Sequence, residues 1–216
     1  MHPRPWLTFL VIGTVSIIVM AFFALRLKPI MRDKTTDETI TTITEPTVSF
    51  VNPSKGAENP KVTIVEFGDF QCVACKELSM NLEVVLKSFP NDLRVVWKDM
   101  PNESAHPMAT FAAVAAHCAD RQGKFWEYHD ALYERQTFLS EDELSKIALE
   151  LELNTEVFSK CIDSRDTLPI VRKDYDEGKA LGILATPTFY IGEKSAVGAI
   201  SVEDLMGLIR QSMLME

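Results

Sequence analysis

The hydrophobic pattern changes period within residues 62–79, where the sequence VTIVEFGDFQCVACKELS passes from a strand-like run to a helical one. Residues 62–67 are a short run rich in β-branched side chains, which predicts a buried strand. From Cys75 to Phe89, apolar residues recur at steps of three and four. That spacing predicts an amphipathic helix with one buried face, ended by Pro90. The chain therefore passes from strand to helix at a pair of cysteines.

Further strands are predicted near both ends of the remaining chain, and helices between them. Residues 93–98 predict a second core strand beside the first, and residues 48–51 are a candidate edge strand. A mainly helical pattern then continues for about a hundred residues. The final segments predict a hairpin of residues 187–191 and 195–200, followed by an amphipathic helix that ends near residue 213. Three polar residues are suited to capping helix starts: Ser140, Asn154 and Ser201.

Cys72 stands at the predicted start of the first helix, and Cys75 follows three residues later. Unpaired backbone N–H groups and the positive end of the helix dipole both favour a thiolate at Cys72. Cys75 falls in line with the apolar face, where it can close a small disulfide ring while shielded from substrate. We therefore expect Cys72 to be the nucleophile and Cys75 to resolve the mixed disulfide.

Glu66 is a carboxylate within the otherwise apolar strand of residues 62–67. Burying such a group is costly unless it has a partner or a chemical task. A side chain pointing under the helix start can exchange a proton with Cys75 as that thiol attacks, and burial would raise its pKa. The alternative is a glutamate at the strand edge that faces water.

Metal binding is the main alternative use of a CxxC pair. Zinc requires four ligands and usually a second pair of cysteines, whereas Cys118 and Cys161 stand singly. We therefore expect no structural zinc and no other cofactor. Paired thiols also suit Cu(I), so a copper carrier is kept as an alternative, although no methionine or histidine is close to the CxxC in sequence.

A second motif lies near the C-terminus, where residues 182–192 read GILATPTFYIG. FGDFQCVAC together with ATPTFYIG resembles the thioredoxin superfamily, in which a cis-proline loop faces the CxxC across the substrate groove. The segment between the motifs is longer than in thioredoxin itself. Its stretches KDMP, HPMATFAAVAAHCADRQGKFWEYHDALYE and FSKCIDS resemble the DsbA-like thiol:disulfide oxidoreductases. The likeness runs from about residue 53 to the C-terminus.

The resemblance implies an α/β protein, a thioredoxin fold with a helical domain inserted at about residues 103–180. By this resemblance, Cys72 is the nucleophile, Cys75 is the resolving thiol and Glu66 is the buried acid. It further implies that Pro187 is the cis-proline and that Thr186 lends backbone contacts to a bound peptide.

The sequence departs from the family between the two cysteines. Val73 stands where many relatives have proline, and Ala74 stands where DsbA has a histidine that stabilises the thiolate. A stabilised thiolate in the reduced protein makes the disulfide a stronger oxidant. Because Val73 and Ala74 supply no such charge, we expect a milder oxidant than DsbA.

Composition and charge favour one globular domain with an appendage. The chain has 216 residues, of which 46% are hydrophobic and 25% charged, and its net charge is −9. Residues 1–34 hold five Lys/Arg against one Asp, which leaves −13 for the rest of the chain. Such an acidic domain argues against binding to nucleic acid. No dimerisation domain is visible, so we expect a monomer.

Residues 6–25 contain no charged side chain. At 1.5 Å per residue, a helix of that length spans roughly the 30 Å hydrocarbon core, which predicts an N-terminal transmembrane helix. The alternative is a signal peptide cleaved near Ala21. We expect a membrane anchor with a basic flank at residues 1–34, a flexible linker at residues 35–52 and the catalytic domain at residues 53–216.

The flanking charges and the family resemblance predict opposite orientations for this segment. Four Lys/Arg follow it and only Arg4 precedes it, so the positive-inside rule would keep the domain in the cytoplasm. Stable disulfide donation, however, requires an oxidising compartment. We expect the catalytic domain on the outer side, in the periplasm or at the cell exterior, with a cleaved and secreted form as the alternative.

Cys118 and Cys161 complete an even number of cysteines. In an exported chain an even count favours a second disulfide, although spacing alone does not show contact. The alternative is two buried free thiols that act as small hydrophobic residues. A bridge between them would stabilise the fold by about 2–4 kcal/mol.

These patterns together predict a thiol:disulfide oxidoreductase that donates or exchanges disulfides in exported proteins, with thiol-containing proteins as its substrates. By the family resemblance, reoxidation would need a quinone-linked membrane partner of the DsbB or vitamin K epoxide reductase (VKOR) type. The alternatives are a disulfide reductase or isomerase of the same fold and the Cu(I) carrier.

Overall fold

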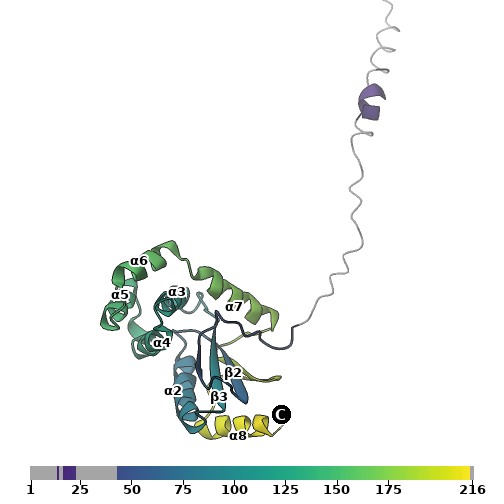
Figure 1. Cartoon of the computed structure of the whole chain (residues 1–216). Coiled ribbons are helices and arrows are strands. Elements are labelled where there is room, and N and C mark those ends of the chain that lie inside the picture. Colours follow the sequence, from purple (N-terminus) through teal and green to yellow (C-terminus); the bar gives the residue numbers. More distant parts are fainter. Residues whose placement is uncertain (1–13, 15–16, 23–42, 215–216) are drawn as a thin grey trace, which may run out of the picture. The chain divides into compact units, whose positions relative to one another are not determined.

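The computed structural model describes residue 14, residues 17–22 and residues 43–214 (Figure 1). Residues 17–22 are helical. No helix within this described part of the chain is both long and apolar enough to cross a membrane. The predicted transmembrane segment, residues 6–25, lies largely outside the described residues and stays a prediction.

The chain divides into two compact units, Met1–Thr41 and Thr42–Glu216. A five-stranded sheet with the order β1-β3-β2-β4-β5 forms the centre of the second unit. β2 and β3 run parallel, and the other neighbours are antiparallel. The strands are β1 (Ser54–Gly56), β2 (Val62–Gly68), β3 (Leu93–Asp99), β4 (Thr188–Ile191) and β5 (Lys194–Val197).

The prediction of two adjacent core strands is confirmed. Val62 on β2 is opposite Leu93 on β3, and Glu66 is opposite Trp97. Both strands are buried along almost their whole length. This explains their nearly continuous apolar sequence, because a parallel pair covered on both faces needs little alternation.

The predicted edge strand at residues 48–51 is wrong. That segment turns instead, because the side chain of Asn52 accepts a hydrogen bond of 3.0 Å from the backbone N–H of Ser49. Asn52 also donates its own N–H to the carbonyl of Ser49. Side chains that bond to neighbouring backbone groups compete with strand pairing. The edge strand begins instead at Ser54 of β1, which pairs with Val96 of β3.

The helices α3 to α7 fall between β3 and β4 in the chain, as the helical pattern predicts. Figure 1 shows α3, α4, α5 and α6 gathered beside the sheet. The predicted caps are confirmed: Ser140, Asn154 and Ser201 accept hydrogen bonds from the backbones of α5, α6 and α8. The helices are α2 (Val73–Ser88), α3 (Ala109–Asp120), α4 (Phe125–Glu134), the 3₁₀ turn η1 (Gln136–Phe138), α5 (Glu141–Glu150), α6 (Thr155–Ser164), α7 (Leu168–Ala180) and α8 (Val202–Met213).

Alternate residues of β2 pack on opposite faces of the sheet. Ile64 packs in the cluster formed with α2 and α8, whereas Val65 packs in the cluster that includes Ile183 just after α7. α7 approaches the sheet closely at Gly178, where an added Cβ would lie 2.7 Å from the sulfur of Met100. The sheet is thus covered on both faces, as in other layered α/β folds.

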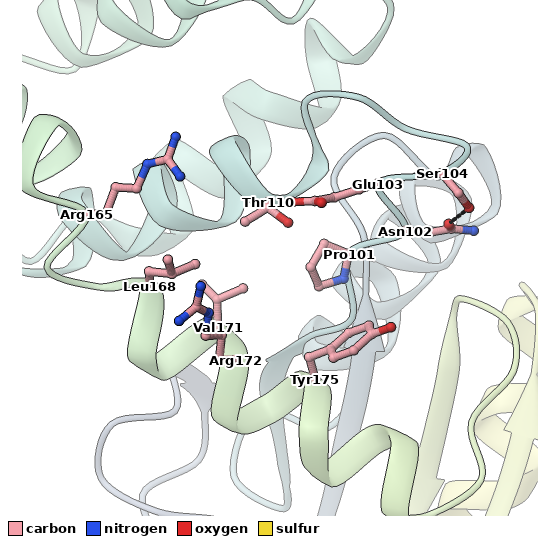
Figure 2. A pocket seen from close by; sticks show the side chains of 10 residues that line it. All are labelled: Pro101, Asn102, Glu103, Ser104, Thr110, Arg165, Leu168, Val171, Arg172 and Tyr175. Carbon is pink, nitrogen blue, oxygen red and sulfur yellow. Dashed lines mark hydrogen bonds between the residues drawn. The ribbon is translucent and has the colours of Figure 1, made fainter.

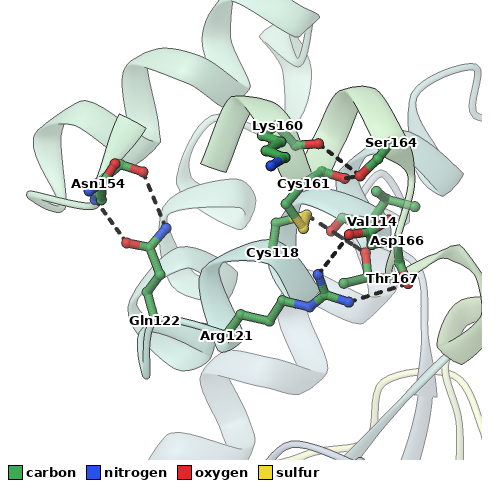
Figure 3. Close-up of a disulfide and its surroundings, with 10 residues drawn as sticks. All are labelled: Val114, Cys118, Arg121, Gln122, Asn154, Lys160, Cys161, Ser164, Asp166 and Thr167. Carbon is green, nitrogen blue, oxygen red and sulfur yellow. Dashed lines mark hydrogen bonds and ion pairs between the residues drawn. A yellow bond between two sulfur atoms is a disulfide. The ribbon is translucent and has the colours of Figure 1, made fainter. Parts of the chain in front are cut away.

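A disulfide between Cys118 and Cys161 joins α3 to α6. Figure 3 shows it beside the ion pair of Arg121 and Asp166, whose nitrogen and oxygen are 3.2 Å apart. The predicted pairing of these two cysteines is therefore present in the structure. It closes a loop across a sequence separation of 43 residues within the helical part of the molecule.

A buried ion cluster fastens β3 to α7. The ammonium of Lys98 lies 2.9 Å from Asp174 and 2.7 Å from Glu177. The side-chain amide of Asn52 donates to Asp174 at 3.1 Å, and Thr47 donates two hydrogen bonds to Glu177. Residues 47–52 are therefore held against α7 by polar contacts.

Candidate thiol–disulfide site

The CxxC cysteines lie at the start of α2, as the sequence predicts. Cys72 occupies the N-cap position, and its carbonyl accepts the backbone N–H of Cys75 at 3.1 Å. Cys72 is 8% exposed and Cys75 is fully buried. Both are free thiols in this structure. The outer cysteine is therefore the only one of the two that a partner can reach at the surface.

Two polar side chains hold the turn that leads into α2. Asp69 accepts the backbone N–H of Gln71 at 2.7 Å and bonds the ring nitrogen of His106 at 2.8 Å. Gln136 in η1 donates from one amide nitrogen to the carbonyls of Phe70 and Cys72, each at 2.9 Å. Sequence reasoning missed the contacts of Asp69 with His106 and of Gln136 with the turn, because they join segments that are far apart in the chain.

The second motif meets the first through the sheet. Thr188 at the start of β4 pairs with Phe67 near the end of β2, so the loop before β4 reaches the start of α2. The Thr186–Pro187 peptide bond in this loop is cis. The thiol of Cys72 donates a hydrogen bond of 3.3 Å to the carbonyl oxygen of Thr186. Residues separated by 114 positions therefore form one site.

The electrostatic surroundings of Cys72 favour its thiolate. Its pKa is lowered from 9.0 to about 6. The hydrogen bond from the Cys75 thiol is the largest cause, and backbone N–H groups of Ala74 and Cys75 lower the pKa further, while burial opposes them. Backbone N–H groups at the start of a helix point toward an anion placed there and stabilise it.

Cys75 and Glu66 are each held in the neutral form. Burial raises the pKa of Cys75 well above its ordinary 9.0, and the hydrogen bond to Cys72 and the charge of Glu66 raise it further. Glu66 is 2% exposed, so it does not face water. Burial raises its pKa to about 8, opposed by the positive charge of Lys55. One oxygen of Glu66, Oε1, has no hydrogen-bond partner among the residues that the structure describes.

Lys55 and Tyr133 also act on this site, and sequence reasoning missed both. Lys55 on the edge strand β1 pairs with Glu83 and lies 4.4 Å from the ring centre of Trp126. The hydroxyl of Tyr133 is buried without a partner, and burial followed by the charge of Cys75 raises its pKa. No motif in the sequence marks either residue, because each reaches the site only through tertiary packing.

Aromatic residues pack between the sheet and the helical insert. Phe70 stacks on Trp97 with ring centres 4.7 Å apart, and Phe125 packs on Trp126 at 5.2 Å. They belong to the apolar cluster that also contains both cysteines of the CxxC. This packing fixes the site between the sheet and the helices.

Solved structures of similar fold include a thioredoxin-like oxidoreductase and a thiol-disulfide exchange protein. A thioredoxin-like oxidoreductase from Silicibacter pomeroyi is 25% identical, with a TM-score of 0.66 over 76% of this chain and 93% of that one. BdbD from Bacillus subtilis is 23% identical, with a TM-score of 0.68 over 76% and 94%. The thiol-disulfide exchange protein alpha-DsbA2 from Wolbachia pipientis is 21% identical, with a TM-score of 0.68 over 76% and 88%.

Curated proteins of similar sequence include much longer chains. Na(+)/H(+) antiporter NhaA 1 of Salinispora arenicola is 32% identical over 155 residues, which are 72% of this chain and 24% of that protein. Na(+)/H(+) antiporter NhaA of Herminiimonas arsenicoxydans is 31% identical over 158 residues, 73% of this chain and 25% of that protein. The chain thus spans about a quarter of the length of these relatives.

The fold, with its paired cysteines at the start of a helix, is that of a thioredoxin-like protein. The family model described as Thioredoxin matches residues 51–211, and the chain belongs to that family. The resemblance seen in the two sequence motifs is therefore confirmed.

Proposed function

We propose that this protein exchanges disulfides with thiol-containing proteins through Cys72 and Cys75, and that it donates disulfides to exported proteins. One observation carries the proposal. A cysteine with a pKa of about 6 lies 3.3 Å from the carbonyl beside Pro187, above a buried thiol of raised pKa. One sulfur is thus suited to leave as a thiolate, and the other to stay protonated.

The reaction passes two electrons from the substrate to the protein. A substrate thiolate attacks the sulfur of Cys72 in the oxidised pair, which breaks the bond to Cys75 and forms a mixed disulfide. A second substrate thiolate then attacks the substrate sulfur of that bond. The substrate leaves as a disulfide, and Cys72 leaves as a thiolate. Its low pKa makes Cys72 a good leaving group in this step.

Glu66 supplies the proton that the buried sulfur needs. When the disulfide opens, Cys75 is released as a thiolate in a place that disfavours charge. Glu66 has a pKa of about 8 and is therefore mostly protonated at neutral pH. It gives its proton to Cys75 during opening and takes it back when Cys75 attacks the mixed disulfide in the reverse direction.

The second disulfide supports an oxidising compartment. Structural disulfides persist in exported proteins and are rare where thiol reductants are abundant, and Cys118 and Cys161 form one here. We place the catalytic domain outside the cytoplasm, in the periplasm or at the cell exterior, tethered by residues 6–25. A reduced pair must then pass its electrons on, and a quinone-linked membrane protein of the DsbB or VKOR type has the required chemistry.

The pair is a milder oxidant than DsbA. Val73 is 75% exposed and, like Ala74, brings no charge to the thiolate. The pKa of about 6 at Cys72 lies between the values of about 3.5 for DsbA and about 7 for thioredoxin. A less stabilised thiolate corresponds to a less oxidising disulfide.

Trapping of the mixed disulfide tests the proposal. The full chain, oxidised, is mixed with a reduced peptide that carries two cysteines, and the products are separated without reductant and weighed by mass spectrometry. The parent protein converts the peptide to its disulfide. Reduced Cys75→Ser, incubated with the oxidised peptide, accumulates a peptide adduct on Cys72, whereas Cys72→Ser accumulates none. An adduct of equal yield on Cys72→Ser, or no exchange by the parent, contradicts the proposal.

A further inference from the structure

Two neighbouring cavities extend from the site along α7. The smaller, of about 190 Å³, is lined by Thr186, whose carbonyl accepts the Cys72 thiol. The larger, of about 430 Å³, opens between α7 and the segment that joins β3 to α3. Pro101, Asn102 and Tyr175 line both cavities. The two hollows therefore adjoin along α7, next to the loop whose Thr186 carbonyl contacts the Cys72 thiol, and together we call them the α7 groove.

The α7 groove is positively charged. Arg165 and Arg172 line its larger cavity, and Lys179 lines its smaller one. Figure 2 shows Arg172 on α7, Arg165 on the turn before α7 begins, and Glu103 close to Thr110. Among the described residues that line the groove, Glu103 is the single acidic side chain. The groove thus carries a local excess of positive charge.

These three cations are available to a ligand. All three residues are exposed, and within the described part of the chain none of them forms an ion pair. Arg165 rests on the ring of Phe111 at 5.3 Å, which holds it without neutralising it. A patch of unpaired cations is unusual on a domain whose residues 35–216 carry a charge of −13. Charge complementarity therefore points to an acidic ligand.

The spacing along α7 matches an extended peptide. Arg172, Tyr175 and Lys179 follow one another at steps of three and four, which places them on one face of the helix. Seven residues of helix separate the two cations by about 10 Å. An extended chain in the polyproline II conformation covers about that distance in three residues, which is one turn, so its side chains three residues apart lie on the same side. Leu184, 94% exposed, adds an apolar surface to the smaller cavity.

We infer that the α7 groove binds an extended segment of the substrate protein next to its reactive cysteine, and that it selects segments with acidic side chains about three residues apart. The inference rests on the proposed function, because the substrate cysteine must reach Cys72. Carboxylates of the segment pair with Lys179 and Arg172, and Arg165 extends the cationic stretch. The backbone of the substrate segment, beside its reactive cysteine, lies next to Thr186.

Binding of matched peptides tests this inference without requiring any disulfide exchange. The acidic probe is a fluorescent peptide with Ser in place of the central cysteine and Glu at every third position on both sides. The matched probe has Gln at the same positions. Fluorescence anisotropy with the full chain is expected to show the acidic peptide bound more tightly, by up to about fivefold for each pair formed. Added salt should reduce that difference by screening.

Variants of adjacent residues on α7 provide the control. Arg172→Gln and Lys179→Gln should each weaken the acidic peptide by up to about fivefold and leave the Gln peptide unchanged. Lys173→Gln removes the same charge from an exposed residue of α7 that does not line the groove, and it should have little effect. Equal affinity for both peptides, or equal losses in Arg172→Gln and Lys173→Gln, overturns the inference.

The same peptides with cysteine restored separate this inference from the proposed function. If the protein oxidises paired cysteines in acidic and Gln peptides at equal rates, the proposed function holds and the selectivity is refuted. If it oxidises neither peptide but still binds the acidic Ser peptide through Arg172, the groove exists and the proposed function fails. The expected result is oxidation of both, with the acidic peptide faster in the parent and equal to the Gln peptide in Arg172→Gln/Lys179→Gln.

Discussion

The thiol of Cys72 donates a hydrogen bond of 3.3 Å to the carbonyl oxygen of Thr186. This contact joins the start of α2 to the loop of the cis Thr186–Pro187 bond. A substrate segment bonded to the backbone of that loop would bring its own sulfur to the sulfur of Cys72. The reactive group and the surface that would position its substrate are therefore adjacent before any substrate binds.

The reactivity of Cys72 toward an alkylating reagent should follow its low pKa. We predict that the rate constant for iodoacetamide with the reduced protein rises with a midpoint near pH 6. In Cys75→Ala the midpoint should move upward, because the hydrogen bond from Cys75 is the largest cause of the lowered pKa. Cys72→Ala should show no alkylation with a midpoint near pH 6. A parent midpoint near 9, or no movement in Cys75→Ala, would contradict the assignment.

Glu66 should make the folded protein less stable as the pH rises. Its pKa is about 8 when folded and near the ordinary 4.5 when unfolded, so between these values the folded state binds more protons than the unfolded one. The contribution is fully present below about pH 4.5 and is lost as the pH rises toward 8. The total change is about 5 kcal/mol.

Urea unfolding of reduced Cys72→Ser, the parent of this series, at a series of pH values measures this effect. The substitution is needed because the lowered pKa of Cys72 would otherwise raise stability above about pH 6 and offset the fall. In Glu66→Gln the fall in stability between pH 5 and 8 should be largely removed. Glu77→Gln, which removes an exposed carboxylate from α2, should keep the parent profile. A parallel fall in the parent and in Glu66→Gln would show that other groups cause the pH dependence.

The disulfide between Cys118 and Cys161 should contribute to stability and not to exchange. Closing a loop across 43 residues restricts the unfolded chain, which predicts a loss of about 3–4 kcal/mol in Cys118→Ala/Cys161→Ala. Denaturant unfolding measures the loss. The reduction potential of the Cys72–Cys75 pair should remain that of the parent, and a changed potential would assign the second disulfide a part in the redox chemistry.

Within the buried ion cluster, replacement of Lys98 should cause the largest loss of folding stability. Lys98→Met leaves the carboxylates of Asp174 and Glu177 without their cation in a buried place, which costs about 3–5 kcal/mol. Lys98→Met/Asp174→Asn should recover part of that loss. Lys173→Met, an exposed change on α7, should shift the unfolding midpoint little. Equal effects of Lys98→Met and Lys173→Met would argue against the cluster.

Much of the fold follows from local patterns in the sequence. The apolar run of β2 and the three- and four-residue steps of α2 place Cys72 at a helix start, which the structure confirms. The caps at Ser140 and Ser201 likewise follow from residues that act on their own neighbours. Such features are predictable because their causes lie within a few positions of the residue itself.

The remaining features depend on residues that meet only in the folded chain. Gln136 reaches the carbonyl of Cys72 across 64 positions, and Lys55 reaches the neighbourhood of Glu66 from the edge strand. No spacing rule links such pairs. The predicted strand at residues 48–51 is wrong for a local reason instead. The side chain of Asn52 stabilises a turn there, although the nearby valines favour a strand.

The central claim is that Cys72 and Cys75 form a disulfide of intermediate oxidising strength. Each pKa unit at the attacking cysteine corresponds to about 1.4 kcal/mol, or about 30 mV for a two-electron couple. Interpolating from DsbA at about −120 mV and thioredoxin at about −270 mV, a pKa of about 6 predicts about −200 to −240 mV.

Equilibration of the full chain with glutathione buffers, followed by a count of thiols at Cys72 and Cys75, measures this potential directly. A value of about −200 to −240 mV is the result that the account predicts. A value at or above about −120 mV would contradict the milder oxidant, and one at or below about −270 mV would make the protein a reductase. A pair that never exchanges with glutathione would contradict the proposed function itself.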